Sequence, residues 1–269
     1  MKMDGSLLSA ERRLHVNWLK GARTLMTMTS QAGSICASES EIIVRTAGQK
    51  NLVIVGATGM VGGYALRYAL EHSAVGRATT IGHRKVGISH PRLTEVLHQD
   101  FADCSALAEV LSDQDAAIFC PGAYTGAVSD TELRTITVDY TIEFARVLHD
   151  SSPEAAFAFL SGSGADPTGR SRISFARYKG EAENALLATG FASVYIFRPA
   201  YIYPVTSRRE PNFGYRLLRA IYPAFRLIFP HQVVRADDLA RAMVEVAVRG
   251  TEERQGLVLE NRDIQAIVE

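Results

Sequence analysis

A glycine-rich run near residue 56 constrains the fold of this chain more than any other feature. The run Gly56–Gly62 reads G-A-T-G-M-V-G and follows a short apolar segment, Asn51–Gly56 (NLVIVG). A buried parallel strand that ends in glycine and leads into a helix has this pattern. Gly56 permits a tight turn, Gly59 lets a ligand approach the backbone, and Gly62 lets the helix pack closely on the strand. The run therefore predicts a phosphate-binding turn, with dinucleotide contacts from Gly56, Thr58, Gly59, Met60, Val61 and Gly62.

Short apolar segments alternate with amphipathic segments along the rest of the chain. The expected strands are Asn51–Gly56, Ala78–Ile81, Leu93–Leu97, Ala116–Cys120, Ala156–Leu160 and Ser193–Phe197. The expected helices are Met60–His72, Cys104–Leu111 with Asp103 as N-cap, Asp130–Leu148 and Ser174–Ala188. This order predicts an α/β fold of the Rossmann type, a doubly wound parallel sheet. Ligands of such sheets bind beyond the carboxyl ends of the strands.

The pattern changes after Arg198. We expect a loop over Tyr201–Pro211, an interrupted helix over Phe213–Phe229, a helix over Asp237–Arg249 and a strand over Gly256–Glu260. This part is too small for a core of its own. The domain prediction is therefore a single Rossmann domain over residues 51–269, in which residues 200–269 cover the substrate side.

Residues 1–50 differ in composition from the rest, because they are basic at first and then rich in Ser, Thr and Ala. Apolar residues between Leu7 and Leu25 recur near helical spacing, which favours a short amphipathic helix. A poorly ordered extension, sequence upstream of a start at Met26 or Met28, and a transit peptide are the alternatives. Acidic residues at positions 4 and 11 argue against the transit peptide.

The charge balance gives no sign of a nucleic-acid or membrane partner. Lys and Arg total 29, as do Asp and Glu, so the formal net charge is zero. No run approaches the roughly 18 apolar residues that a membrane span needs. The three cysteines form no C-x-x-C pair, which fits a reducing cytoplasm, and the histidines have no metal-ligand spacing. We therefore expect a cytoplasmic protein without a metal site.

The end of the second expected strand points to the cofactor. NAD sites place an acid there for the ribose 2′-hydroxyl, but this chain has Ile81-Gly82-His83-Arg84-Lys85. Arg84, helped by Lys85 or His83, would instead pair with a 2′-phosphate, so we predict NADP(H). Asp100 and Phe101, after the third strand, are expected to contact the adenine. Pro121 and Gly122, after the fourth strand, are further expected cofactor contacts.

These motifs, taken in order, resemble the atypical short-chain dehydrogenase/reductases, and within them the Tat-interacting oxidoreductase type. The matching segments are VGATGMVGG, TIGHRK, HQDFAD, IFCPGAY, FLSGSGAD, ARYKGEAE, YIFRPAYIY and LVLEN. They cover nearly all of residues 51–262. The resemblance implies a Rossmann fold, NADP(H) and a substrate pocket under the C-terminal segment. It also implies a monomer or homodimer that binds a small-molecule substrate.

The resemblance also implies a catalytic set of Ser, Tyr and Lys. Lys179 matches the lysine, which lowers the pKa of the tyrosine and holds the nicotinamide ribose. Ser161 or Ser163 matches the serine that positions the substrate oxygen. Phe175 stands at the tyrosine position, four residues before Lys179, and has no acidic proton.

Because Phe175 has no hydroxyl, the residue that would donate the proton is not identified by the resemblance. Tyr178 adjoins Lys179 but lies about 100° round the helix, so it needs a bulge to take over. Tyr124, Tyr201 and Tyr203 lie on expected loops and are further candidates. Pro199 matches a residue whose backbone passes near the nicotinamide.

Two functions follow from these observations. The first is an NADP-dependent oxidoreductase on a small carbonyl or alcohol, with an atypical active site that uses Lys179, Ser161, Ser163 or Tyr178. The second is a catalytically degenerate NADP(H)-binding regulator or scaffold, which Phe175 favours.

Overall fold

The core of the molecule is one parallel sheet. The computed structural model describes residues 48–122, 128–205, 232–250 and 257–269. The sheet has seven strands in the order β3-β2-β1-β4-β5-β6-β9, and every neighbouring pair is parallel. The strands are β1 (Lys50–Val55), β2 (Val75–Gly82), β3 (Leu93–Leu97), β4 (Ala116–Phe119), β5 (Ala156–Leu160), β6 (Ser193–Arg198) and β9 (Leu257–Glu260). This order confirms the predicted Rossmann-type fold.

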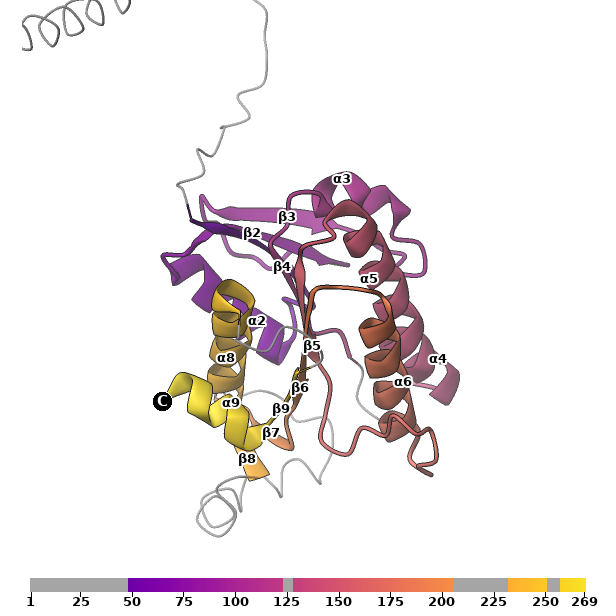
Figure 1. Cartoon of the computed structure of the whole chain (residues 1–269). Coiled ribbons are helices and arrows are strands. Elements are labelled where there is room, and N and C mark those ends of the chain that lie inside the picture. Colours follow the sequence, from indigo (N-terminus) through magenta and orange to yellow (C-terminus); the bar gives the residue numbers. More distant parts are fainter. Residues whose placement is uncertain (1–47, 123–127, 206–231, 251–256) are drawn as a thin grey trace, which may run out of the picture. The chain divides into compact units, whose positions relative to one another are not determined.

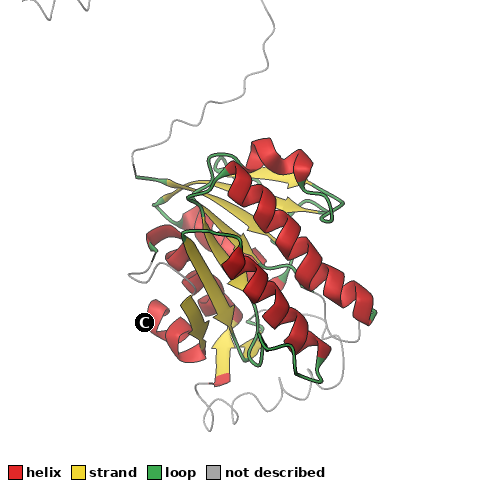
Figure 2. Cartoon of the chain, turned by 45° about the vertical axis from the view of Figure 1, so that its right-hand side comes forward, coloured by secondary structure: helices red, strands yellow, loops and turns green. Residues whose placement is uncertain are grey.

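Helices cover both faces of the sheet (Figures 1 and 2). One face carries α2 (Met60–Glu71), α8 (Ala236–Arg249) and α9 (Asn261–Val268), and the other carries α3 (Ala108–Leu111), α5 (Tyr140–Ser151) and α6 (Ser174–Ala188). Alternate side chains of β1 pack against the helices on opposite faces of the sheet. Leu52 packs with the α2 and α8 side, whereas Val53 packs with the α5 and α6 side. A strand buried on both faces is continuously apolar for this reason.

The long helix expected over Asp130–Leu148 is present, but it is built in three parts. They are α4 (Asp130–Arg134), a π-helical turn (Thr135–Asp139) and α5. Thr135 to Val138 are four β-branched residues in a row, which regular helix accommodates poorly. The wider turn brings residues five apart together, and Arg134 Nη1 pairs with Asp139 Oδ1 at 2.8 Å.

Bounds of β5, β3 and α6 agree with the prediction to the residue, and the remaining predicted strands agree to within a few residues. The helix expected from Cys104 begins as a 3-10 turn (Ser105–Leu107) and continues as α3. Its N-cap is Cys104, although the Asp103 carboxylate still accepts the Ser105 N–H at 2.9 Å.

The C-terminal part departs furthest from the prediction. The segment expected as a loop begins with a strand, β7 (Tyr201–Tyr203), which pairs in parallel with β8 (Val233–Arg235). Helix α9 was not predicted. Helix α8 packs against α2 and the sheet, in the hydrophobic core, rather than over the strand ends. The helices expected over residues 213–229 and near the N-terminus lie outside the described residues.

No helix within the described ranges is both long and apolar enough to cross a bilayer.

Candidate functional site

The glycine turn between β1 and α2 has the backbone geometry that a phosphate cradle requires. Gly56 has φ +85°, and a Cβ there would lie 2.8 Å from the carbonyl carbon of Cys120 at the end of β4. The Gly59 N–H donates to Gly56 O at 2.9 Å. A Cβ on Gly62 would overlap Gly56 O, so only glycine allows α2 to pack this closely on the turn.

The first turn of α2 presents free backbone donors. Gly59 is the N-cap, no side chain caps the helix, and no acidic residue lies in its first turn. The N–H groups of such a turn and the positive end of the helix dipole favour an anion. The Val61 side chain is buried in the core, so Val61 offers a ligand only its backbone, whereas Met60 lines an open groove.

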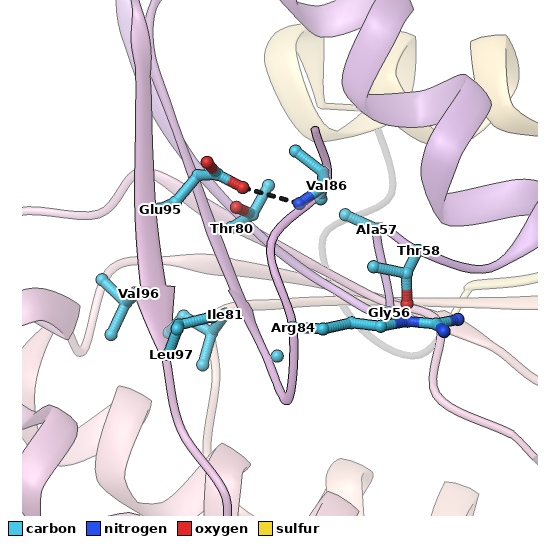
Figure 3. Close-up of a pocket in the computed structure, with 11 residues that line it drawn as sticks. Gly56, Ala57, Thr58, Thr80, Ile81, Arg84, Val86, Glu95, Val96 and Leu97 are labelled. Carbon is cyan, nitrogen blue, oxygen red and sulfur yellow. Dashed lines mark hydrogen bonds between the residues drawn. The ribbon is translucent and has the colours of Figure 1, made fainter. Parts of the chain in front are cut away.

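The loop after β2 borders this groove, which has a volume of about 620 Å³. Arg84 and Lys85 are exposed and line it together with Thr58 and Gly59. The Arg84 side chain extends toward Gly56 and Thr58 (Figure 3). The predicted basic group and the glycine turn therefore border one opening.

The sequence did not predict a role for Glu95. It lies on β3 opposite Thr80, and it lines the small inner pocket beside Arg84. Its Oε1 accepts the Val86 N–H at 2.7 Å, which fastens the loop that carries Arg84 (Figure 3). A strand position so far from the glycine turn in sequence gives no local signal for this role.

His83 and Phe101 make a separate aromatic cluster. The Phe101 ring is buried and lies edge-on to the rings of His83, at 5.5 Å, and of His98, at 5.2 Å. His83 does not line the groove. Phe101 therefore offers a ligand only its backbone, because its ring belongs to the core.

Asp100, Pro121 and Gly122 remain accessible at the strand ends. Asp100 is exposed, and its Oδ1 accepts the Ala102 N–H at 3.0 Å. Pro121 is half-buried directly after β4, beside the glycine turn, and Gly122 is exposed. A dinucleotide contact from these three positions stays a prediction.

Phe175, at the usual tyrosine position, lies against Gly162. A Cβ on Gly162 would lie 2.9 Å from Phe175 Cζ, the atom on which a tyrosine would carry its hydroxyl. The residue that faces position 175 is thus the glycine between the two candidate serines. Both members of this contact lack a hydroxyl.

Both predicted serines have partners other than Phe175. Ser161 is buried, and its hydroxyl donates to the Glu183 carboxylate. Ser163 is exposed, and its N–H donates to Pro199 O at 2.8 Å, which ties the loop after β5 to the end of β6. Glu183 is almost fully buried and also pairs with Arg198 through both oxygens. This Ser161–Glu183–Arg198 network was not predicted, because it joins residues that lie at least 15 positions apart in the sequence.

Tyr178 is half-buried and is held by the first residue of α4. Its hydroxyl donates to Asp130 Oδ2 at 2.6 Å, and this hydrogen bond is the main cause that raises the Tyr178 pKa. The structure thus does not bring Tyr178 to the position of the missing hydroxyl. Tyr201 and Tyr203 lie on β7, and Tyr124 lies outside the described residues.

Lys179 is buried beneath the site. Its Nζ donates to Leu160 O at 2.7 Å and lies 4.6 Å from the centre of the Phe159 ring. Burial lowers its pKa to about 8. The ammonium therefore contacts β5, and a ribose contact would require it to exchange this hydrogen bond.

Two solved structures with the same fold hold a nucleotide. The Bordetella bronchiseptica enzyme WbmF, in complex with NAD+, superposes with a TM-score of 0.60 over 81% of this chain and 77% of its own, at 14% identity. A UDP-N-acetylglucosamine 4-epimerase from Methanobrevibacter ruminantium, in complex with UDP-N-acetylmuramic acid, has a TM-score of 0.59 over 78% and 76%, at 17% identity. These likenesses show that the chain has the Rossmann-type fold of nucleotide-binding proteins.

Curated relatives by sequence are fungal mitochondrial proteins. Protein fmp52 of Aspergillus clavatus is 30% identical over 158 residues, which is 56% of this chain and 66% of that protein. The chain thus spans just under two thirds of the length of this relative. The Lodderomyces elongisporus protein FMP52 is 25% identical over 74% of this chain and 87% of its own. No protein-family model matches the chain.

These relatives overturn one expectation. Both are named as mitochondrial proteins, so the cytoplasmic location inferred from the cysteines is contradicted. Scattered unpaired cysteines fit any reducing compartment, and therefore they do not single out the cytosol. Neither relative carries the name of the Tat-interacting type, so that narrower resemblance stays a prediction.

Proposed function

We propose that the chain is an NADP(H)-binding protein of the atypical short-chain dehydrogenase/reductase kind, and that it acts as an oxidoreductase on a small carbonyl or alcohol. The observation that carries the proposal is the turn at Gly56, Gly59 and Gly62 with the uncapped first turn of α2. The NAD-bound structure of the same fold supports a nicotinamide dinucleotide in this cradle.

The preference for NADP(H) rests on charge at the groove. Arg84 and Lys85 lie beside the turn, and the end of β2 carries no acid that would select a ribose 2′-hydroxyl. A titration with NADPH and NADH tests this directly. We expect NADPH to bind at least tenfold more tightly, and Arg84→Ala to remove most of that difference. Equal affinity for the two cofactors would contradict the preference.

As an oxidoreductase, the protein would orient substrate and cofactor while the nicotinamide supplies the hydride. The proton for the substrate oxygen cannot come from Phe175, and the Ser161 hydroxyl is already bound to Glu183. The remaining tyrosine candidates from the sequence are Tyr201 and Tyr203 on β7, and Tyr124, which lies outside the described residues. NADPH oxidation with a broad carbonyl panel, compared between wild type and the Tyr201→Phe and Tyr203→Phe variants, tests this assignment.

A degenerate site is the second candidate, and the contact between Phe175 and Gly162 favours it. The protein would then bind NADP(H) as a regulator or scaffold without turnover. Phe175→Tyr separates the two candidates, with Phe175→Leu as the control that lacks a hydroxyl. Activity that is absent in wild type, gained in Phe175→Tyr and absent in Phe175→Leu would identify a degenerate enzyme site. Turnover by wild type with any carbonyl of the panel would rule the scaffold out.

We further propose a mitochondrial location, which the names of the fungal relatives support. The basic residues near the N-terminus, Arg12, Arg13, Lys20 and Arg23, suit a targeting segment, although Asp4 and Glu11 are unusual in one. Imaging of the full chain fused at its C-terminus to a fluorescent protein tests the location, with a fusion that begins at Met26 as the comparison. A diffuse cytosolic signal from the full-length fusion would contradict it.

A further inference from the structure

We propose that Arg67, on α2, contacts the 2′-phosphate of the bound dinucleotide and so helps select NADP(H). This inference rests on the proposed function, but it assigns a residue that no sequence motif singled out. Arg67 lines the groove of about 620 Å³ that starts at the glycine turn and is bordered by the loop after β2.

The groove follows one stripe of α2. Met60, Gly63, Tyr64 and Arg67 line it, at the three- and four-residue spacing that places side chains on one face of a helix. Gly63 carries no side chain, so the groove stays open between Met60 and Arg67. The opposite wall is the loop over residues 84–88, which carries Arg84 and Lys85.

Among the described residues, every charged side chain of the groove is a cation. Arg67, Arg84 and Lys85 contribute three cations, and no carboxylate is among the described residues that line it. All three side chains are exposed, and within the part of the chain that the structure describes none of them joins an ion pair. Other exposed arginines, such as Arg134 and Arg146, pair with carboxylates. Three unpaired cations around one opening suit a dianion.

Helix geometry lets Arg67 reach the phosphate. Side chains of a helix tilt toward its N-terminus, so an extended Arg67 side chain can run back along α2 toward the glycine turn. Arg67 follows Met60 by seven positions, which corresponds to a rise of about 10 Å along the helix axis. The tilt and the length of an extended arginine side chain cover most of this distance. The Arg84 side chain extends toward Gly56 and Thr58 (Figure 3), and Thr58 lines the same groove as Arg67.

The third cation is Arg67 and not His83. The His83 ring lies edge-on to Phe101 and does not line the groove. An arginine also suits a phosphate better, because its planar guanidinium donates two parallel hydrogen bonds and stays charged at any physiological pH.

The experiment measures dissociation constants by calorimetry for NADPH and NADH with wild type, Arg67→Ala and Arg67→Lys. Arg262→Ala, which removes an exposed arginine on α9, is the matched control. Arg67→Ala should weaken NADPH about tenfold and leave NADH within about twofold, because only NADPH carries the 2′-phosphate. Arg67→Lys should recover part of the loss. The fragments 2′,5′-ADP and 5′-ADP should reproduce this difference without a nicotinamide.

Three outcomes overturn the inference: an unchanged NADPH affinity in Arg67→Ala, an equal loss for NADPH and NADH, or an equal loss in Arg262→Ala. In each case wild type still binds NADPH, so the proposed function stands. If wild type binds neither dinucleotide, the proposed function fails together with the inference. Arg67 is exposed, so the variant should fold, and its thermal melting temperature checks this.

Discussion

The ring of Phe175 occupies the space that a side chain at position 162 would need. Phe175 Cζ and Cε1 would lie 2.9 and 3.1 Å from a Cβ on Gly162. The backbone of Gly162 is not left-handed, so any residue could adopt its conformation. Glycine at 162 is therefore explained by its neighbour on α6, and the two positions are coupled through packing.

Gly162→Ala should consequently destabilise the protein by overpacking, by about 1–3 kcal/mol. In a Phe175→Ala background the ring is gone, and the same substitution should cost much less. Urea denaturation of wild type, both single variants and the double variant gives the coupling energy as a double-mutant cycle. If Gly162→Ala costs the same in both backgrounds, the contact does not explain the glycine.

The glycine turn supports a second prediction. Gly56→Ala combines a left-handed backbone with a Cβ 2.8 Å from the Cys120 carbonyl, so the turn must deform. We expect loss of NADPH binding and a destabilisation of at least 1–3 kcal/mol. Gly169→Ala is the control, because Gly169 has φ +70° but open space around its Cα. The control isolates backbone strain, so an equal cost in both variants would argue against the steric explanation.

Local sequence patterns predicted most of this fold because most of it is locally determined. The apolar run of β5 and the helical spacing of α6 are complete within their own residues, and their bounds were predicted to the residue. Strands β7 and β8 have three residues each and pair across about 30 positions of chain. A pairing at that distance leaves no mark in either segment, so the sheet they form could not be predicted.

The sequence predicted most residues of the candidate site, but it did not predict which of them contact one another. The absence of a tyrosine at position 175 is plain in the sequence, whereas the residue that faces it depends on how the loop after β5 folds. That loop turns Ser161 inward to Glu183 and places Gly162 against Phe175. In the same way, Arg84 was predicted at the groove, but Arg67 is placed there by the packing of α2.

The buried carboxylate of Glu183 supports a third prediction. Its side chain is 1% exposed, accepts from Ser161 and pairs with Arg198, which is itself 20% exposed. Glu183→Gln keeps the volume but leaves the Arg198 guanidinium without its charge partner, and we expect a loss of about 3–5 kcal/mol. Glu181→Gln on the same helix removes the exposed pair with Arg134 and should cost less than about 1 kcal/mol. Chemical denaturation measures both, and similar costs would contradict a structural role for the buried pair.

The fourth prediction concerns pH, because burial lowers the pKa of Lys179 to about 8 from 10.5. Below pH 8 the amine is charged in the folded and unfolded states, and folding carries the cost of a buried ammonium. Between about pH 8 and 10.5 the unfolded chain binds the extra proton, so stability rises with pH in this window. Above it both states are neutral and the cost has disappeared.

Lys179→Met removes this titration, while Lys50→Met, which alters a half-exposed lysine paired with Asp115, serves as control. The free energy of unfolding of wild type minus that of Lys179→Met should increase by up to a few kcal/mol between pH 7.5 and 10.5. Subtraction cancels the other groups that titrate in this range. A difference that stays flat, or that falls as pH rises, would mean that the ammonium of Lys179 is stabilised by its contacts with Leu160 O and the Phe159 ring more than burial disfavours it.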